Sequence, residues 1–328
     1  MHYNLNHIYD PDIPDHLNNF LNYLGTIRGK SKNTIDGYKV DLIMFFRFLK
    51  LYRGKVSNDQ EFENIKINDI DDSFIKKIKL SDLFAFISFA ENYRNNGSYA
   101  RARKVATLKS FFKYLNGKAK IIDENPALEL ESPKISKRNP IYLTLEESKA
   151  LLNCIDGKYK ERDYCIITLF LNCGLRLSEL CGIDISRIKE DTLTVIGKGN
   201  KERTVYLNNA CMKAIHNYLM VRNQDYDKIR DKDALFISKN YTRINKRSVE
   251  MMLKKYLGKA ELDTDKYTPH KLRHTAATLM YKYGNVDIRS LQKILGHENV
   301  STTQIYTHVD DEKLREAVRS NPLSDEDL

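Results

Sequence analysis

Long apolar runs, tryptophan and turn-forming residues are scarce in this chain of 328 residues. Tryptophan is absent, and only 7 prolines and 14 glycines are present, so helix-forming residues dominate. The longest apolar stretch, residues 165–171, is too short to span a bilayer. The first residues lack the basic segment and apolar run of a signal peptide. These absences predict a soluble cytoplasmic protein without a membrane partner.

The sequence also lacks the patterns that indicate a bound cofactor. No C-x-x-C pair is present, so the five cysteines are expected to be buried reduced thiols rather than zinc or redox sites. They are Cys154, Cys165, Cys173, Cys181 and Cys211. The segment G-K-G-N-K-E-R lacks the phosphate-loop spacing G-x-x-x-x-G-K-[ST], which argues against nucleotide binding. No acidic cluster suited to a metal ion is visible, so we expect no metal and no other cofactor.

Length and charge favour two domains and a polyanionic partner. A chain of 328 residues exceeds the usual size of a single core. The net charge of +10 favours nucleic acid as the partner. A basic surface with no specific partner would have the same composition, so charge alone does not decide between the two.

The first 131 residues are predicted to form a small all-α domain. Apolar residues spaced by three and four positions predict four helices, and no segment there is typical of a strand. The helices are expected at residues 13–28, from Ser31 to about residue 49, from Ser81 onwards and at residues 98–115.

A linker and a second domain follow. Residues 132–141 contain the segment S-P-K-I-S-K-R-N-P, whose prolines and cations are typical of an extended connection. Thr144 and Glu147 then match a capping box, which marks the first helix of a second domain at residues 142–328.

The second domain is predicted to be mainly α-helical with a small β-sheet. An almost wholly apolar helix at residues 162–173 ends at Gly174, and another helix begins just after it. β-rich runs at residues 192–196 and 203–207 flank a glycine-rich turn and predict a hairpin. Helices at 210–221 and 245–260, a short strand at 234–237 and a last helix at 312–318 complete the prediction.

Basic residues on the fourth helix, in the linker and around the hairpin turn are candidates for contacts with DNA. They are Arg101, Arg103, Lys104, Lys109, Lys137, Arg138, Lys201 and Arg203. The fourth helix also has an apolar face, so its cations fit either a phosphate-binding face or a face that stays solvated.

The residues suited to chemistry gather near the end of the chain, in T-P-H-K-L-R-H-T and L-G-H-E-N-V-S-T-T-Q-I-Y-T-H. His270 and Arg273 follow Pro269 and share one face of a helix first turn, where backbone donors favour anions. His297 follows the break at Gly296, and Ser301 to Thr303 predict a helix start before Tyr306.

Together these side chains suit attack on a phosphodiester. Guanidinium groups can hold phosphate oxygens bidentately, and histidine can move a proton near neutral pH. A tyrosine needs such a cationic pocket to act as a nucleophile. A zinc site built from the four histidines is the competing interpretation, but no H-E-x-x-H arrangement or cysteine partner supports it.

The order of these residues resembles the tyrosine recombinase (phage integrase) family. The resemblance extends through G-L-R-L-S-E-L, G-K-G-N-K-E-R and both segments near the end of the chain. It also includes the second helix, where Thr34, Tyr38 and Phe45 are similar to the core-binding, SAM-like domain of Xer-type members. The resemblance implies an all-α core-binding domain and a catalytic domain that close on DNA as a clamp.

The family implies a role for each matching position. Tyr306 would attack the scissile phosphate and form a 3′-phosphotyrosyl link, while Arg176 and Arg273 clamp the phosphate and His297 hydrogen-bonds to it. Lys198 would protonate the leaving 5′-oxygen, and His270 would accept the tyrosine proton. Glu179 would support the first arginine. His274 and His308 are expected to have supporting roles.

The resemblance further implies strand exchange through a Holliday junction, by a homotetramer or by a heterotetramer with a second recombinase on paired DNA sites. The short segment before the helix at Ser31 favours an Xer-type protein that resolves chromosome dimers over an integrase with an added arm-binding domain. A recombinase of a mobile element would be built alike. A type IB topoisomerase and a regulator with idle catalytic residues are the more distant alternatives.

Overall fold

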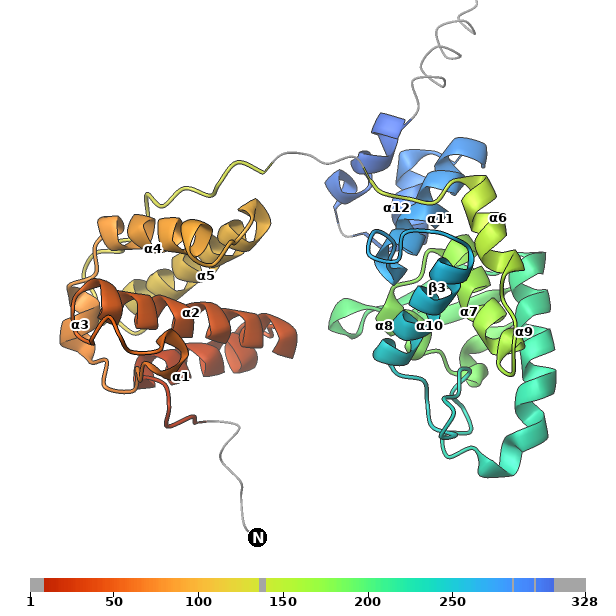
Figure 1. The fold of residues 1–328 in the computed structure, drawn as a ribbon, viewed down its shortest axis with the longest axis horizontal. Helices are drawn as coiled ribbons and strands as arrows, with labels where there is room; N and C mark the ends of the chain where they lie inside the picture. Colours follow the sequence, from red (N-terminus) through yellow and green to blue (C-terminus); the bar gives the residue numbers. More distant parts are fainter. Residues whose placement is uncertain (1–8, 136–139, 285, 298, 310–328) are drawn as a thin grey trace, which may run out of the picture. The chain divides into compact units, whose positions relative to one another are not determined.

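The computed structural model describes residues 9–135, 140–284, 286–297 and 299–309. The chain divides into two compact units, residues 1–137 and 138–328 (Figure 1). Among the described residues, no helix combines the length and apolar character that a bilayer span requires. The predicted helix at residues 312–318 lies outside the described residues.

The first unit consists of helices, as predicted. Its elements are α1 (Asp15–Asn22), the π-helical turn η2 (Tyr23–Ile27), α2 (Lys32–Tyr52), η3 (Phe62–Asn64), α3 (Asp72–Lys76), α4 (Leu80–Asn92) and α5 (Ser98–Gly117). The first predicted helix is α-helical only to Asn22 and continues as the π-helical turn. The short helix α3 was not predicted; its N-cap Asp71 accepts a hydrogen bond from the backbone N–H of Phe74.

Helix α2 packs against α1, α4 and α5, and the core between them is rich in phenylalanine (Figure 1). Phe20 and Phe111, for example, meet edge to face with ring centroids 5.2 Å apart. Charged side chains are also buried in this unit, among them Asp41 and Lys104. The carboxylate of Asp41 on α2 contacts Lys104 Nζ at 3.1 Å and the Thr107 hydroxyl at 3.1 Å on α5.

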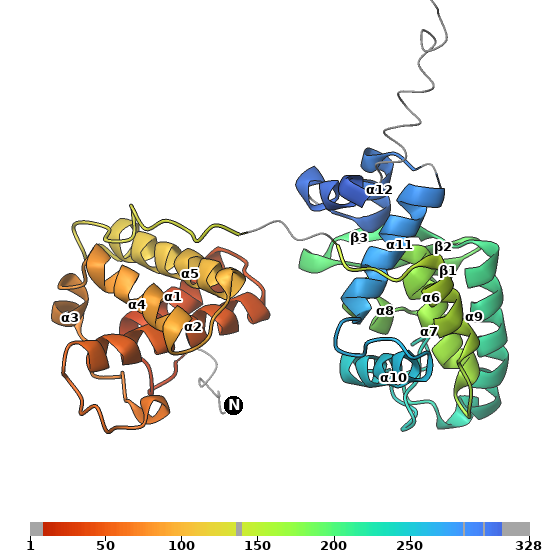
Figure 2. The same ribbon diagram turned by 45° about the horizontal axis from the view of Figure 1, so that its top comes forward.

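The second unit combines helices with one small sheet, again as predicted (Figure 2). The helices are α6 (Leu145–Asn153), α7 (Lys160–Cys173), α8 (Leu177–Cys181), α9 (Asn209–Arg222), α10 (Lys246–Lys259), α11 (Pro269–Tyr283) and α12 (Ile288–Leu295). The strands are β1 (Ile188–Lys189), β2 (Thr192–Ile196) and β3 (Glu202–Tyr206). Short 3-10 turns are η4 (Ile185–Arg187), η5 (Lys198–Asn200), η6 (Asn223–Lys228), η7 (Val300–Thr302) and η8 (Gln304–Val309).

The three strands form an antiparallel sheet in the order β1-β2-β3, and β2 pairs with β3 as the predicted hairpin. The predicted strand at residues 234–237 is wrong, because those residues form only isolated bridges, from Ala234 to Asp184 and from Ile237 to Arg243. An isolated bridge pairs only one residue on each side, so residues 234–237 do not form a continuous ladder with another strand. The segment before Tyr306 likewise forms 3-10 turns rather than an α-helix.

Helix α7 lies at the centre of the second unit and packs against α6, α9 and α11. Its apolar residues are almost all buried, and Gly174 ends it in the left-handed conformation at φ 58°. The capping box at Thr144 and Glu147 is also present, with the Thr144 N–H donating to Glu147 at 2.7 Å. Four of the five cysteines are buried and all five are free thiols.

Candidate active site

Arg176 stands at the N-cap of α8, two residues after the glycine that ends α7. Its Nη1 lies 2.7 Å from Glu179 Oε1, and its Nη2 donates to the backbone oxygen of Gly296 at 2.9 Å. The Glu179 carboxylate also accepts a hydrogen bond from the Arg176 backbone N–H. One arginine thus joins α8 to the segment that follows α12, and about a third of its side chain stays exposed.

Arg273 comes from the first turns of α11, where Thr268 is the N-cap and Pro269 the first residue. The side chain is buried, and its two terminal nitrogens donate to the backbone oxygens of Gly174 and Leu295, both at 2.6 Å. Burial, followed by the nearby Arg176, lowers the pKa of Arg273 to about 10, so the guanidinium remains charged at neutral pH. Arg273 therefore fixes the end of α7 against the end of α12.

Glu179 is the carboxylate shared by these cations. Its side chain has no exposed surface, and Arg203 Nη2 on β3 lies 2.8 Å from Glu179 Oε2. Burial acts to raise the pKa of Glu179, but the hydrogen bonds and charges of Arg203 and Arg176 outweigh it and leave the pKa lowered. Arg203 also donates to the backbone oxygen of Ile294. Its side chain is mostly buried, so the position expected to contact DNA serves here to hold β3 against α8 and α12.

Two histidines lie close to the arginines. His270 is exposed at the start of α11, and His297 is half-buried with its Nδ1 2.9 Å from the Thr303 hydroxyl. Burial and the neighbouring arginines lower the pKa of His297 to about 4. Desolvation and nearby cations also lower the pKa of His270. Both rings are therefore neutral at neutral pH.

These side chains line one open cleft of about 550 Å³. Arg176, Arg273, His270 and His297 all belong to its walls. The structure thus brings together four of the six predicted catalytic residues, from α8, α11 and the segment after α12. The cleft also includes Lys246 and Ser178, which the sequence analysis did not single out. Lys246 begins α10 directly after its cap Asn245, and no motif distinguishes it from other helix-start lysines.

Tyr306 lies next to this cleft but is not among the described residues that line it. The residue is only 1% exposed, and burial raises the pKa of its phenol to about 12. Its hydroxyl lies 2.7 Å from Nδ1 of His274. His274, predicted to have a supporting role, is thus in direct contact with the predicted nucleophile.

Two predicted residues cannot be placed at the level of side chains. Lys198 belongs to the turn η5 between β2 and β3, and His308 belongs to η8, but the structure does not describe either side chain. Their predicted roles remain predictions. Within the described residues, no three His, Cys, Asp or Glu side chains gather as metal ligands would.

The predicted DNA contacts fall into different environments. Lys109 and Lys201 are exposed, whereas Arg101 pairs with Glu91 at 2.6 Å. Arg103 is nearly half exposed and contacts Asp41. Lys137 and Arg138 lie outside the described residues.

Lys104 is buried, contrary to the prediction that it contacts DNA. It is 4% exposed and its ammonium group faces Asp41 inside the first unit, so it cannot contact a phosphate in this conformation. The helical spacing placed Lys104 on a mixed face of α5. Lys104 is buried because its ammonium group pairs with the buried carboxylate of Asp41 on α2, which is distant in the sequence.

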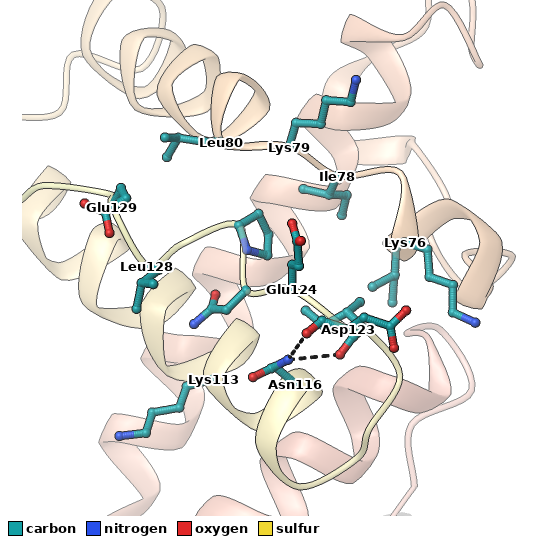
Figure 3. Close-up of a pocket in the computed structure, with 14 residues that line it drawn as sticks. Lys76, Ile78, Lys79, Leu80, Lys113, Asn116, Asp123, Glu124, Leu128 and Glu129 are labelled. Atoms are coloured by element: carbon teal, nitrogen blue, oxygen red, sulfur yellow. Dashed lines mark hydrogen bonds between the residues drawn. The ribbon is translucent and has the colours of Figure 1, made fainter.

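A larger hollow, of about 1220 Å³, lies in the first unit (Figure 3). Its cations and carboxylates are mixed: Lys76, Lys79 and Lys113 share it with Asp123, Glu124 and Glu129. The Asn116 amide ties one wall together by donating to the backbone oxygens of Ile122 and Asp123. This balance of charge does not suit a phosphate, whereas the smaller cleft of the second unit is rich in cations.

Comparison with known proteins gives matches to both units. The model of the phage integrase family matches residues 142–313, and that of the phage integrase N-terminal SAM-like domain matches residues 17–118. The chain is 63% identical to the tyrosine recombinase XerC of Caldanaerobacter subterraneus subsp. tengcongensis, over 95% of this chain and 88% of that protein.

Two solved structures share the fold. The XerH site-specific recombinase bound to its palindromic difH substrate, in a post-cleavage complex, matches with TM-score 0.70 and 22% identity over 89% of this chain and 81% of that one. A lambda integrase tetramer bound to a Holliday junction matches with TM-score 0.63 and 16% identity over 87% and 77%.

Proposed function

The chain belongs to the phage integrase family and is a site-specific tyrosine recombinase of the Xer type, and from this premise we propose how its residues cleave and rejoin DNA. The observation that carries the proposal is the cleft in which Arg176, Arg273, His270 and His297 meet, with Tyr306 beside it. These groups come from separate elements, and a phosphodiester is the ligand that their charges and donors fit together.

In the proposed reaction the phenolic oxygen of Tyr306 attacks the scissile phosphorus and the bond from phosphorus to the 5′-oxygen breaks. The phosphorus is then bonded to the phenolic oxygen of Tyr306 and stays attached to the DNA strand through its 3′-oxygen. His270 accepts the phenolic proton, and Lys198 supplies the proton that the leaving 5′-oxygen needs. A 5′-hydroxyl from the partner duplex then reverses the step and releases Tyr306. The phosphotyrosyl bond preserves the energy of the diester, so this cycle consumes no ATP.

The two arginines would stabilise the charge that builds up on the non-bridging oxygens. Arg176 and Arg273 repel each other, which contributes to the lowered pKa of Arg273. A phosphate between them removes that repulsion and accepts their hydrogen bonds. The same arginines lower the pKa of His297. The negative charge of a bound phosphate would offset the charge of the arginines, and His297 would then hydrogen-bond to the phosphate.

We further propose a role for each domain and the number of protomers that assemble on DNA. Residues 1–131 would act as the core-binding domain, residues 132–141 as the linker and residues 142–328 as the catalytic domain, which together close on duplex DNA. The likeness to a tetramer on a Holliday junction supports four protomers on two paired sites, either four copies of this chain or two with a second recombinase. The identity to a XerC protein supports resolution of chromosome dimers in the cytoplasm as the biological task.

Covalent trapping tests the chemistry. A nicked duplex carrying the site that this protein selects from a random library should trap wild-type protein as an adduct, because the short fragment that bears the 5′-hydroxyl diffuses away. Tyr306→Phe should bind the duplex with unchanged affinity and form no adduct. An adduct formed by Tyr306→Phe would overturn the assignment of the nucleophile.

A sulfur substitution tests the assignment of Lys198. Replacing the bridging 5′-oxygen by sulfur gives a leaving group that does not need a proton. Lys198→Ala should therefore cleave the ordinary site at least about 100-fold slower and the sulfur-bridged site at nearly the wild-type rate. A Lys198→Ala variant that is equally slow on both substrates would show that another group supplies the proton.

A supercoiled plasmid with two sites separates recombination from its rivals. Two direct repeats should give two smaller circles, whereas a type IB topoisomerase would only relax the plasmid and an idle regulator would leave it unchanged. The DNA around the gene separates the biological tasks, because a mobile element would show its own ends there. Relaxed plasmid without new circles would refute the proposed strand exchange.

A further inference from the structure

Tyr306 is packed away from the place where a phosphate would bind. Its ring lies in a small apolar cluster with Ala277 of α11 and with Leu291 and Leu295 of α12. At 1% exposure its oxygen cannot touch a phosphorus atom of bound DNA. The cleft that holds Arg176 and Arg273 is nevertheless open in the same structure. In this conformation the phenolic oxygen is therefore not presented to the cleft that holds the two arginines.

One polar contact holds the phenol in this position. The hydroxyl of Tyr306 lies 2.7 Å from Nδ1 of His274, and the two rings are 5.6 Å apart between centroids. Desolvation and the neighbouring His270 lower the pKa of His274 to about 3, while burial raises that of Tyr306, so both groups are neutral at neutral pH. A neutral ring can share one proton with a neutral phenol without leaving a buried charge.

His274 is also the neighbour of a cleft residue. It follows His270 by one helical turn on α11, and the two rings meet edge-on with centroids 4.5 Å apart. His270 lines the cleft, so a phosphate bound there is one side chain away from the contact to Tyr306. Occupation of the cleft and release of the tyrosine are therefore physically connected through two imidazoles.

We propose that His274 is the positioning residue that holds Tyr306 withdrawn from the phosphate cleft until DNA is bound, an inference that rests on the proposed role of Tyr306 as nucleophile. Removing the contact leaves the hydroxyl buried and unpaired, which destabilises the withdrawn position relative to the released one. His274 acts through Tyr306 and does not itself contact the phosphate.

Matched substitutions separate the hydrogen bond from the packing. In His274→Asn the side-chain amide can occupy the position of Nδ1 and retain the contact. His274→Phe keeps a ring of similar shape and removes the contact, and His274→Gln places its amide further out. Adduct formation would be measured in a single turnover on the nicked duplex, at saturating DNA.

The Phe and Gln variants should form the adduct about 10-fold faster than wild type at unchanged affinity for DNA, and the Asn variant should match wild type. A slower Phe variant beside a normal Asn variant would mean that the contact orients Tyr306 for attack rather than withholding it, which overturns the proposal. Equal rates in all variants, or losses in all of them, would overturn it as well.

A second measurement does not depend on DNA cleavage, so it tests this inference separately from the proposed function. Protein labelled with 3-fluorotyrosine gives a 19F signal for residue 306, assigned by its loss in Tyr306→Phe. In DNA-free protein this signal should show a larger solvent isotope shift in His274→Phe than in wild type or His274→Asn. An unchanged shift in His274→Phe would refute the inference even if wild-type protein formed no adduct.

Discussion

Arg203 Nη2 lies 2.8 Å from Oε2 of Glu179, on a carboxylate whose side chain has no exposed surface. The same carboxylate holds Arg176 at 2.7 Å through its other oxygen. Arg203 belongs to β3 and Arg176 to the start of α8, so a single buried anion sets the spacing between the hairpin and the first arginine of the cleft. The hairpin turn carries Lys198, so this ion pair also fixes the base of the segment that presents the proposed acid.

Glu179→Gln should destabilise the second unit by about 3–5 kcal/mol, because it leaves buried guanidinium groups without their anion. Chemical unfolding followed by circular dichroism would measure the loss, since the chain has no tryptophan to report it. Glu202→Gln is the matched control: it breaks the exposed pair with Arg187 and should cost less than about 1 kcal/mol. Equal losses in the two variants would contradict the central role of Glu179.

Arg176→Lys should reduce the rate of adduct formation by about 100-fold or more while changing DNA affinity little. Lysine keeps the charge but cannot hold two phosphate oxygens while it also contacts Glu179 and Gly296. Single-turnover cleavage and a DNA-binding titration would separate the two effects. A variant that cleaves normally would show that charge alone suffices at this position.

Much of the second unit could be predicted from local patterns. The glycine after α7, the capping box at Thr144 and the hairpin of β2 and β3 each depend on a few adjacent residues, and all three are present. The order of the six predicted catalytic residues was also visible, because family motifs are stretches of sequence. The structure then brought four of them to one cleft.

Features that depend on contacts between distant segments could not be predicted. The contact from His274 to Tyr306 exists because η8 packs against α11, and the sequence shows only that both residues are present. The same holds for Arg203, which points to Glu179 rather than outwards. At residues 234–237 a β-rich run lacked a partner strand, and propensity does not supply one.

Acidification should destabilise the second unit over a defined range of pH. The pKa values of His297 and His274 are lowered to about 4 and about 3 in the folded protein, below the value of about 6.5 in an unfolded chain. Below pH 6.5 the unfolded chain therefore binds more protons, so stability present at pH 7 is lost as the pH falls towards 4.

The loss should reach at most about 1.4 kcal/mol per pH unit for each of these histidines. Unfolding in urea at pH 7 and pH 5 would measure this loss. His297→Asn should reduce the difference in the free energy of unfolding between the two pH values. The exposed His216 gives the control, because His216→Asn should leave that difference unchanged. A wild-type protein that is as stable at pH 5 as at pH 7 would contradict the prediction.

The ion pair between Lys104 and Asp41 is expected to contribute to the stability of the first unit and not to DNA binding. Lys104 faces Asp41 at 3.1 Å, and both side chains are almost wholly buried in the first unit. Asp41→Ala should therefore cost about 3–5 kcal/mol, because it leaves a buried ammonium group without a partner. The double variant Asp41→Leu with Lys104→Met should recover most of that loss, since two apolar groups of similar size need no partner.

The same double variant tests where the DNA-binding surface lies. It removes a cation that the sequence placed on a basic face, yet its affinity for the selected duplex should equal that of wild type, because Lys104 does not reach the surface. Lys109→Gln removes an exposed cation from the same helix and is the matched comparison. If α5 contacts the DNA backbone, Lys109→Gln should weaken binding and reduce the slope of log K against log salt concentration by about 1. The double variant should change neither the affinity nor this slope. A double variant that binds more weakly than Lys109→Gln would show that Lys104 moves out to the phosphates when DNA is bound.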